Sequence, residues 1–172
     1  MKKIYLLALV VFGFSVNSFA QVNAPATASA TIIAPIAIVK ATDMNFGNLA
    51  VGTTAGEIVL SPAGARTPGG GVTLPASGGT VSAASFNVTG ESGTTYSITL
   101  PSTISLSNGL GESMDLEDFT SASGTAANSA STGILTGGAQ TIFVGATLNV
   151  AASQAKGSYT TTTPFEVTVN YN

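Results

Sequence analysis

The sequence contains no cysteine, no histidine and no tryptophan, and only 8% of its 172 residues are charged. Without cysteine the chain can form no disulfide bond, so its folded state must depend on a hydrophobic core. Without histidine or cysteine it also lacks the common nucleophile–base pairs and the usual ligands of zinc, copper and non-haem iron. We therefore expect a protein that is not an enzyme and that uses no cofactor.

Positive charge is equally scarce. The only Lys and Arg residues after position 20 are Lys40, Arg66 and Lys156, and the whole chain has a net charge of −3. Nucleic-acid binding depends on clustered cations that displace counterions from phosphates. Attraction to anionic lipid also requires basic clusters. We expect neither nucleic acid nor an anionic lipid surface among the partners.

The first 20 residues have the pattern of a cleavable signal peptide. Two lysines precede an apolar run over residues 4–14, and the motif SFA at 18–20 offers a small-x-small cleavage site. An uncleaved membrane anchor is the disfavoured alternative, because this run is shorter than the about 20 residues that a span needs. No second run of that length follows. We predict one β-sandwich domain over residues 21–172, exported to the periplasm, cell surface or medium and not inserted in a membrane.

After residue 20, apolar residues recur at every second position, as in β-strands with one buried face. Segments rich in Gly, Pro or Ser separate these stretches, and we interpret them as turns or loops: 61–71, 75–80, 91–93, 107–111 and 120–133. The residues expected to alternate toward a core are Ala28, Ala30, Ile32, Ile36, Ile38, Met44, Phe46, Ile58, Leu60, Phe86, Val88, Tyr96, Ile98, Ile104, Leu106, Ile142, Val144, Leu148 and Val150. The pattern predicts an all-β, immunoglobulin-like Greek-key β-sandwich, with a closed barrel as the alternative.

One segment, GESMDLEDF at 111–119, gathers half of the acidic residues, namely Glu112, Asp115, Glu117 and Asp118. In an extended conformation Asp115 and Glu117 share a face with Phe119, and Asp118 shares the other face with Leu116. We expect a solvated, negatively charged edge strand that discourages aggregation. Calcium binding is the functional alternative, because carboxylate oxygens are the ligands that calcium prefers. A glycosidase pair is disfavoured, since its two carboxylates flank the sugar from separate elements.

The chain ends in an alternating strand that runs almost to its last residue. We expect one strand over residues 158–163, a break at Pro164, and a final strand over residues 165–171. In the final strand Phe165, Val167, Val169 and Tyr171 lie on one face of the sandwich, and the strand lies at or beside a sheet edge.

Both ends of the chain resemble known sequences. The ending, with Gly157-Ser158-Tyr159, FEVTVNYN and a penultimate Tyr171, is similar to the ends of chaperone–usher pilin subunits. The alternating residues 28–32, followed by Pro35, resemble donor-strand segments of colonisation-factor-type pilins. Residues 35–49 and 157–172 also resemble a family of uncharacterised exported bacterial domains.

The resemblance to pilins implies a sandwich that lacks one strand, which the N-terminal extension of a neighbour supplies at an open edge. It implies that Phe165, Val167, Val169 and Tyr171 form that edge, and that Ala28, Ala30, Ile32 and Val22 belong to the donor segment. The expected function is a non-catalytic structural subunit of a fimbria or pilus, assembled with itself or related subunits. The alternative is a self-contained exported sandwich with an adhesive or ligand-binding role, in which residues 26–39 pack into their own domain.

Overall fold

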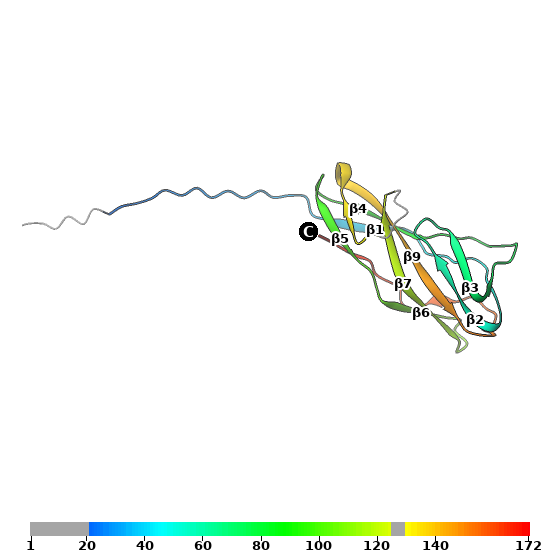
Figure 1. Cartoon of the computed structure of the whole chain (residues 1–172). Helices are drawn as coiled ribbons and strands as arrows, with labels where there is room; N and C mark the ends of the chain where they lie inside the picture. Colours follow the sequence, from blue (N-terminus) through cyan, green and yellow to red (C-terminus); the bar gives the residue numbers. More distant parts are fainter. Residues whose placement is uncertain (1–20, 125–129) are drawn as a thin grey trace, which may run out of the picture. The chain divides into compact units, whose positions relative to one another are not determined.

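The computed structural model describes residues 21–124 and 130–172 (Figure 1). The protein is all-β, with two antiparallel sheets, one of which is curled into a half-barrel. The two-sheet, all-β prediction is therefore confirmed. The predicted signal peptide, residues 1–20, lies outside the described residues.

The chain divides into two units, Met1–Ile32 and Ile33–Asn172. In the first unit, residues 21–32 form no strand or helix, and every one of their side chains is exposed. The second unit contains the sheets. The first strand begins at Ala37, so Ala28, Ala30 and Ile32 form no strand of their own domain, and their role as a donor segment stays a prediction.

Within the described residues, the larger sheet contains eight strands. Six of them follow the order β1-β4-β9-β7-β6-β10, while β2 pairs with β9 and β3 pairs with β2. Their bounds are β1 Ala37–Thr42, β2 Ala50–Leu60, β3 Arg66–Thr73, β4 Ala84–Thr89, β6 Thr103–Ser107, β7 Ser113–Ser123, β9 Ala139–Val150 and β10 Thr160–Thr161.

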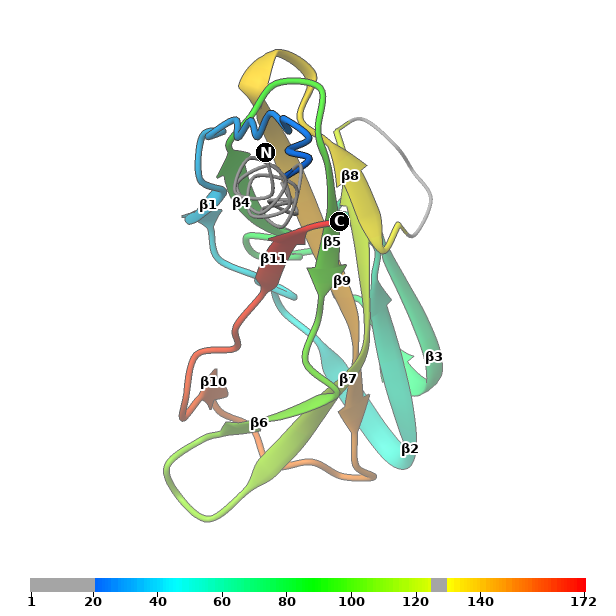
Figure 2. The ribbon, with the colours of Figure 1, turned by 90° about the vertical axis from the view of Figure 1, so that its left-hand side faces the viewer.

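The smaller sheet contains three strands in the order β11-β5-β8. They are β5 Thr95–Thr99, β8 Thr132–Ile134 and β11 Thr168–Tyr171. A short 3₁₀ turn, Thr136–Gly138, joins β8 to β9. Figure 2 shows β11 beside β5, at the edge of this sheet.

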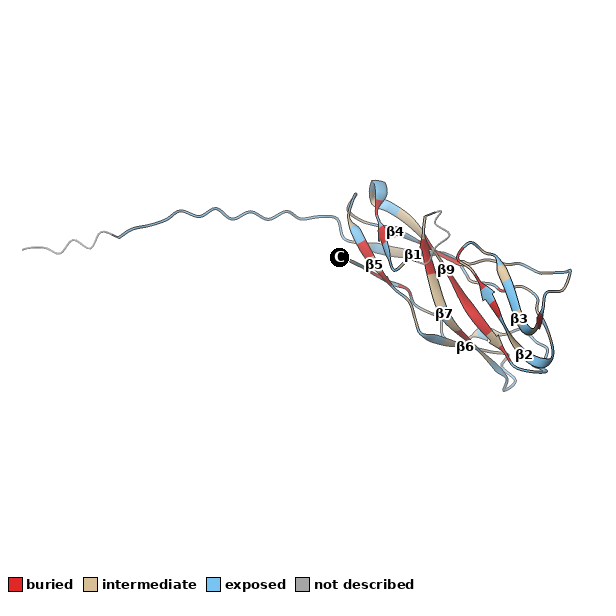
Figure 3. Cartoon of the chain, in the orientation of Figure 1, coloured by how far each residue is buried: buried red, intermediate tan, exposed pale blue. Residues whose placement is uncertain are grey.

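β9 is the central strand of the fold. Along one edge its first half pairs with β4 and its second half with β2, while its other edge pairs with β7. Its alternating side chains from Ile142 to Val150 are all buried, as the sequence predicts. Figure 3 shows this buried stretch crossing the middle of the larger sheet.

Two hydrophobic clusters meet along β9. The inter-sheet cluster draws on strands of both sheets and consists of Ala84, Phe86, Val88, Tyr96, Ile98, Leu135, Ile142, Val144, Val167 and Val169. The half-barrel cluster fills the curl of the larger sheet and consists of Phe46, Ile58, Leu60, Val72, Leu116, Ala146, Leu148 and Val150. Met44 and Phe119 pack against both clusters.

Three segments have a secondary structure that differs from the one predicted from the sequence. The Gly-rich segment 61–71, predicted as a loop, contributes the first part of β3. Its Pro68 is tolerated because β3 pairs with β2 alone and needs no outward-facing donor there. The predicted loop 120–133 is strand at both ends, because its small residues Ser121 and Ala122 are buried in β7. The predicted strand 158–163 shortens to the two residues of β10.

Candidate functional site

The acidic segment forms the turn before β7 and the first half of that strand. Glu112 lies in the β6–β7 turn, while Asp115, Glu117 and Asp118 lie on β7. The prediction of an edge strand is wrong, because β7 pairs with β6 on one side and with β9 on the other. Glu117 Oε1 accepts a hydrogen bond from the Asn149 side-chain amide on β9. In residues 21–124 and 130–172, no group of three or more acidic side chains is placed where it could hold a metal ion.

A β-bulge changes the predicted faces of this segment. Between Glu117 and Thr120, β7 contains one more residue than β9, and Asp118 has a positive φ of 48°. The extra residue reverses the alternation. Asp118 is exposed while Leu116 is buried, and Phe119 packs against both clusters. The prediction that Asp118 shares a face with Leu116, and Phe119 with Asp115, is therefore wrong.

The C-terminal residues lie where their alternation predicts. Val167 and Val169 are buried members of the inter-sheet cluster, and Phe165 and Tyr171 pack against it. Phe165 precedes the strand, and its ring centroid lies 5.4 Å from that of Phe119. Regular pairing is limited to Thr168–Tyr171, which is shorter than the predicted strand 165–171.

β11 pairs with β5 only, so one of its edges is open among the described strands. The Asn172 N–H donates to Thr95 O, and the Ile98 N–H donates away from β11 to Ser131 O. Backbone groups alternate in direction along an antiparallel ladder. The N–H and C=O groups of Val169 and Tyr171 therefore point away from β5, toward the open edge.

The edge strands of this fold differ in how they are protected against unwanted pairing. Lysines, prolines, bulges and short length are the usual protective features. β1 has Lys40 and a bulge between Lys40 and Thr42, β3 contains Pro68, and β10 has only two residues. β11 has four residues with no charge, proline or register shift. β8, the other edge of the smaller sheet, also has no charge, proline or register shift, but it has only three residues, so β11 is the longer of the two unprotected edges.

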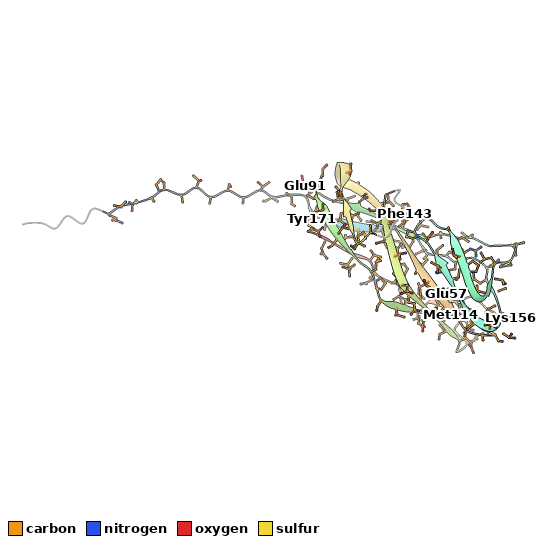
Figure 4. The ribbon with its side chains drawn as sticks, viewed as in Figure 1. Glu57, Glu91, Met114, Phe143, Lys156 and Tyr171 are labelled. Carbon is orange, nitrogen blue, oxygen red and sulfur yellow. The ribbon has the colours of Figure 1, made fainter. Side chains whose placement is uncertain are left out.

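The hydroxyl group of Tyr171 connects the end of β11 to the chain that leads into β1. It accepts a hydrogen bond of 2.6 Å from the Glu91 N–H and donates one of 2.8 Å to the Ala34 carbonyl. The Glu91 carboxylate in turn accepts a hydrogen bond of 3.0 Å from the Ala34 N–H. We call these three residues the latch. Figure 4 shows Glu91 and Tyr171 together at one end of the domain.

The latch requires a glycine beside it. A Cβ atom at position 90 would collide with the Tyr171 hydroxyl and with Leu135 Cδ1. Gly90 therefore permits the close approach of the Tyr171 ring. The sequence analysis did not predict the latch. Tyr171 and the Gly90-Glu91 pair are the residues in the sequence that could have indicated it.

The predicted donor segment forms no strand or helix, and its apolar side chains are exposed. Ala28, Ala30 and Ile32 alternate with polar residues, and the exposed fractions of Val22 and Ile32 are 89% and 98%. Exposed apolar side chains of this size in a segment without secondary structure indicate a surface that remains to be covered. No helix in residues 21–124 or 130–172 is long and apolar enough to cross a membrane.

Two surface hollows of the domain do not indicate a ligand site. One is lined by a mixture of polar and apolar residues of β2, the start of β7 and the end of β9, and the other lies beside β8. Both are open to solvent and lack the enclosed apolar lining typical of small-molecule sites. The open edge of β11 is therefore the feature that best qualifies as a functional site.

These observations define an all-β protein of two antiparallel sheets with an open C-terminal edge strand. Residues 36–171 match the model of the family described as "Domain of unknown function (DUF4402)", and the chain belongs to that family. No curated protein and no solved structure matches the chain. The predicted resemblance to an uncharacterised domain family is thus confirmed at the level of a domain of unknown function.

Proposed function

We propose that this protein is a non-catalytic, exported structural subunit of a fimbria or pilus, assembled by β-strand addition. Residues 21–32 of one copy, or of a related subunit, pair with the open edge of β11 in the next. The observation that carries the proposal is the unprotected edge of β11 in a chain that also presents an exposed, alternating apolar segment. The proposal requires two sheets with one open edge, and it does not depend on an immunoglobulin-like Greek key.

Residues 28–32 match β11 in length and in the alternation of apolar side chains. Residues 28–32 would span about 17 Å as a strand, at about 3.4 Å per residue. This length covers the four residues of β11. Ala28, Ala30 and Ile32 would then lie on one face, where they can extend the inter-sheet cluster. The outward backbone groups of Val169 and Tyr171 would gain hydrogen-bond partners, which is the main source of affinity in strand addition.

Charge does not oppose this pairing. Residues 21–33 contain no charged side chain, and neither does β11. Like charges on opposite strands would destabilise a pair, and none occur here. The nearest acidic residue in sequence is Glu166, which is exposed and lies before the strand.

The proposal is tested by comparing the chain of residues 21–172 with a variant that lacks residues 21–32. The longer chain is expected to form concentration-dependent oligomers in sedimentation velocity experiments, and the shorter variant is expected to stay monomeric. A synthetic peptide of residues 21–32 should bind the shorter variant and raise its melting temperature by mass action.

Two peptide variants give a matched control. Ile32→Asp places a charge on the face expected to be buried, and it should abolish binding. Thr31→Asp places the same charge on the opposite face, and it should leave most of the affinity. Monomers at every concentration, together with no peptide binding, would contradict the proposal.

A second candidate function is a self-contained exported domain with an adhesive or ligand-binding role. Two observations favour it: residues Ala37–Thr42 already pair with β4, and the latch ties Ala34 to the domain. The same experiment separates the two functions, because a self-contained domain stays monomeric and ignores the peptide. Export is tested separately by N-terminal sequencing of secreted protein, which should begin at Gln21.

A further inference from the structure

The open edge of β11 lies close to another strand. Some Cα atoms of β1 and β11 lie within 8 Å of one another, although the two strands belong to different sheets. Neighbouring hydrogen-bonded strands are about 4.8 Å apart, so a strand inserted between two others separates them by about 9.6 Å. A third strand therefore does not fit between β1 and β11 along this stretch.

The latch holds the two strands in this position. Ala34, three residues before β1, is bound through its carbonyl to Tyr171 on β11 and through its N–H to Glu91. Glu91 is itself bound to Tyr171 through its own N–H. Because each of the three residues bonds to the other two, β11 and the approach to β1 cannot separate without loss of these bonds.

Apart from the latch, β1 is held mainly by its backbone pairing with β4, because its side chains are little buried. Of its six residues only Ile38 is even partly buried, and Val39 has an exposed fraction of 66%. Ile36, just before the strand, is also only partly buried. The ion pair between Lys40 of β1 and Asp43 is exposed, and it joins two residues only three positions apart in sequence. It therefore does little to hold β1 to the rest of the domain. For the start of β1 to move, only its first two pairs with β4, Ala37–Thr89 and Ile38–Val88, and the partial burial of Ile36 and Ile38 must be given up.

We propose that the latch is a lock on strand addition: it must open before residues 21–32 of a second copy can pair with β11. This inference rests on the proposed function and adds its regulation. Opening moves residues 33–38 away from β11 and widens the gap to two strand spacings. The hydroxyl group of Tyr171 thus opposes assembly, even though Tyr171 belongs to the edge on which assembly takes place.

The test measures how fast a fluorescent peptide of residues 21–32 binds to the chain of residues 21–172, by stopped-flow anisotropy. Tyr171→Phe keeps the ring and removes only the two hydroxyl hydrogen bonds. The binding rate is expected to rise about 30-fold, as the loss of two hydrogen bonds of about 1 kcal/mol each implies. Glu91→Ala removes only the bond to the Ala34 N–H, and it should give a smaller rise.

Tyr159→Phe is the matched control. The Tyr159 hydroxyl also makes two hydrogen bonds, a 2.7 Å bond to Ala155 O and a 2.9 Å bond from the Gln154 side chain, neither of which involves the latch. Its loss should leave the binding rate unchanged. Amide hydrogen exchange at Ile36 and Ile38 should become faster in Tyr171→Phe and in Glu91→Ala, and should stay the same in Tyr159→Phe.

The outcomes separate this inference from the proposed function. If the peptide binds wild type and Tyr171→Phe at the same rate, the lock is refuted and strand addition stands. Slower binding by Tyr171→Phe would show that the hydroxyl supports the edge, and it would also overturn the lock. If the peptide binds neither chain, strand addition fails and the lock fails with it. If Tyr171→Phe does not fold, Glu91→Ala decides by the same rates.

Discussion

The burial of the last strand can be tested by Val169→Ala. Val169 has an exposed fraction of 7% and is a member of the inter-sheet cluster. It lies opposite Ile98 of β5, which is also buried. The two residues do not exchange backbone hydrogen bonds, and side chains are closest in pairs of this kind. Truncation therefore leaves a cavity between the two sheets.

The size of the effect follows from the two methyl groups that are lost. Each buried methyl group contributes about 0.8 kcal/mol of transfer free energy, which gives about 1.6 kcal/mol. Incomplete collapse of the cavity adds to this loss. We expect the free energy of unfolding to fall by about 2–3 kcal/mol, and the melting temperature to fall by about 4 °C for each kcal/mol.

Urea-induced equilibrium unfolding of the chain of residues 21–172 measures this loss. Asn170→Ala is the control, because Asn170 is the next residue on the same strand and is exposed. Its backbone carbonyl keeps the bond from the Ser97 hydroxyl after the substitution. The control should change the free energy of unfolding by less than about 0.5 kcal/mol. Equal effects of the two substitutions would refute the burial of β11.

Three further predictions concern other parts of the domain. Gly145→Ala should destabilise the protein by about 2–3 kcal/mol, because a Cβ atom there would collide with the Leu60 carbonyl. Gly52→Ala, with open space around it, should have little effect in the same thermal unfolding assay. Burial raises the pKa of Tyr96 above its ordinary value, so its contribution to stability is complete below about pH 10 and is lost as the pH rises further. The fall in melting temperature between pH 9 and 11 should therefore be smaller in Tyr96→Phe than in wild type, and equal slopes would contradict this. Saturating calcium should leave the melting temperature unchanged, since the carboxylates of residues 111–119 are not gathered into a site; a rise that a chelator reverses would show calcium binding.

Strands that cover a core were predictable because every second residue must be apolar. β4, β5 and β9 follow this rule, and Phe86, Ile98 and Leu148 are buried as predicted. The rule fails where small residues do the packing. The second half of β7 buries Ser121 and Ala122. Small residues of these types are also common in flexible loops, so the sequence does not distinguish the two cases.

Edge strands and bulges were harder to predict, since backbone pairing determines them. β3 is held to β2 by its backbone ladder, although its sequence contains Pro68 and three consecutive glycines. One extra residue at Asp118 exchanges the two faces of β7 beyond it. No change in residue type in the segment indicates where such an extra residue lies.

The buried face of β11 was predictable, and the latch was not. Alternation from Phe165 to Tyr171 identifies the face of the strand that is turned toward the core. The latch depends on backbone atoms of Ala34 and Glu91, which are far from Tyr171 in sequence. Every residue type presents the same backbone groups, so the sequence contains no pattern that pairs them.

The central position of β9 has a consequence for the order in which the protein can fold. Both hydrophobic clusters include residues of β9, and β2, β4 and β7 all use it as a partner. A chain made from its N-terminus contains no completed cluster until residue 150 has been added. Neither cluster can therefore form in full until most of the chain has been synthesised.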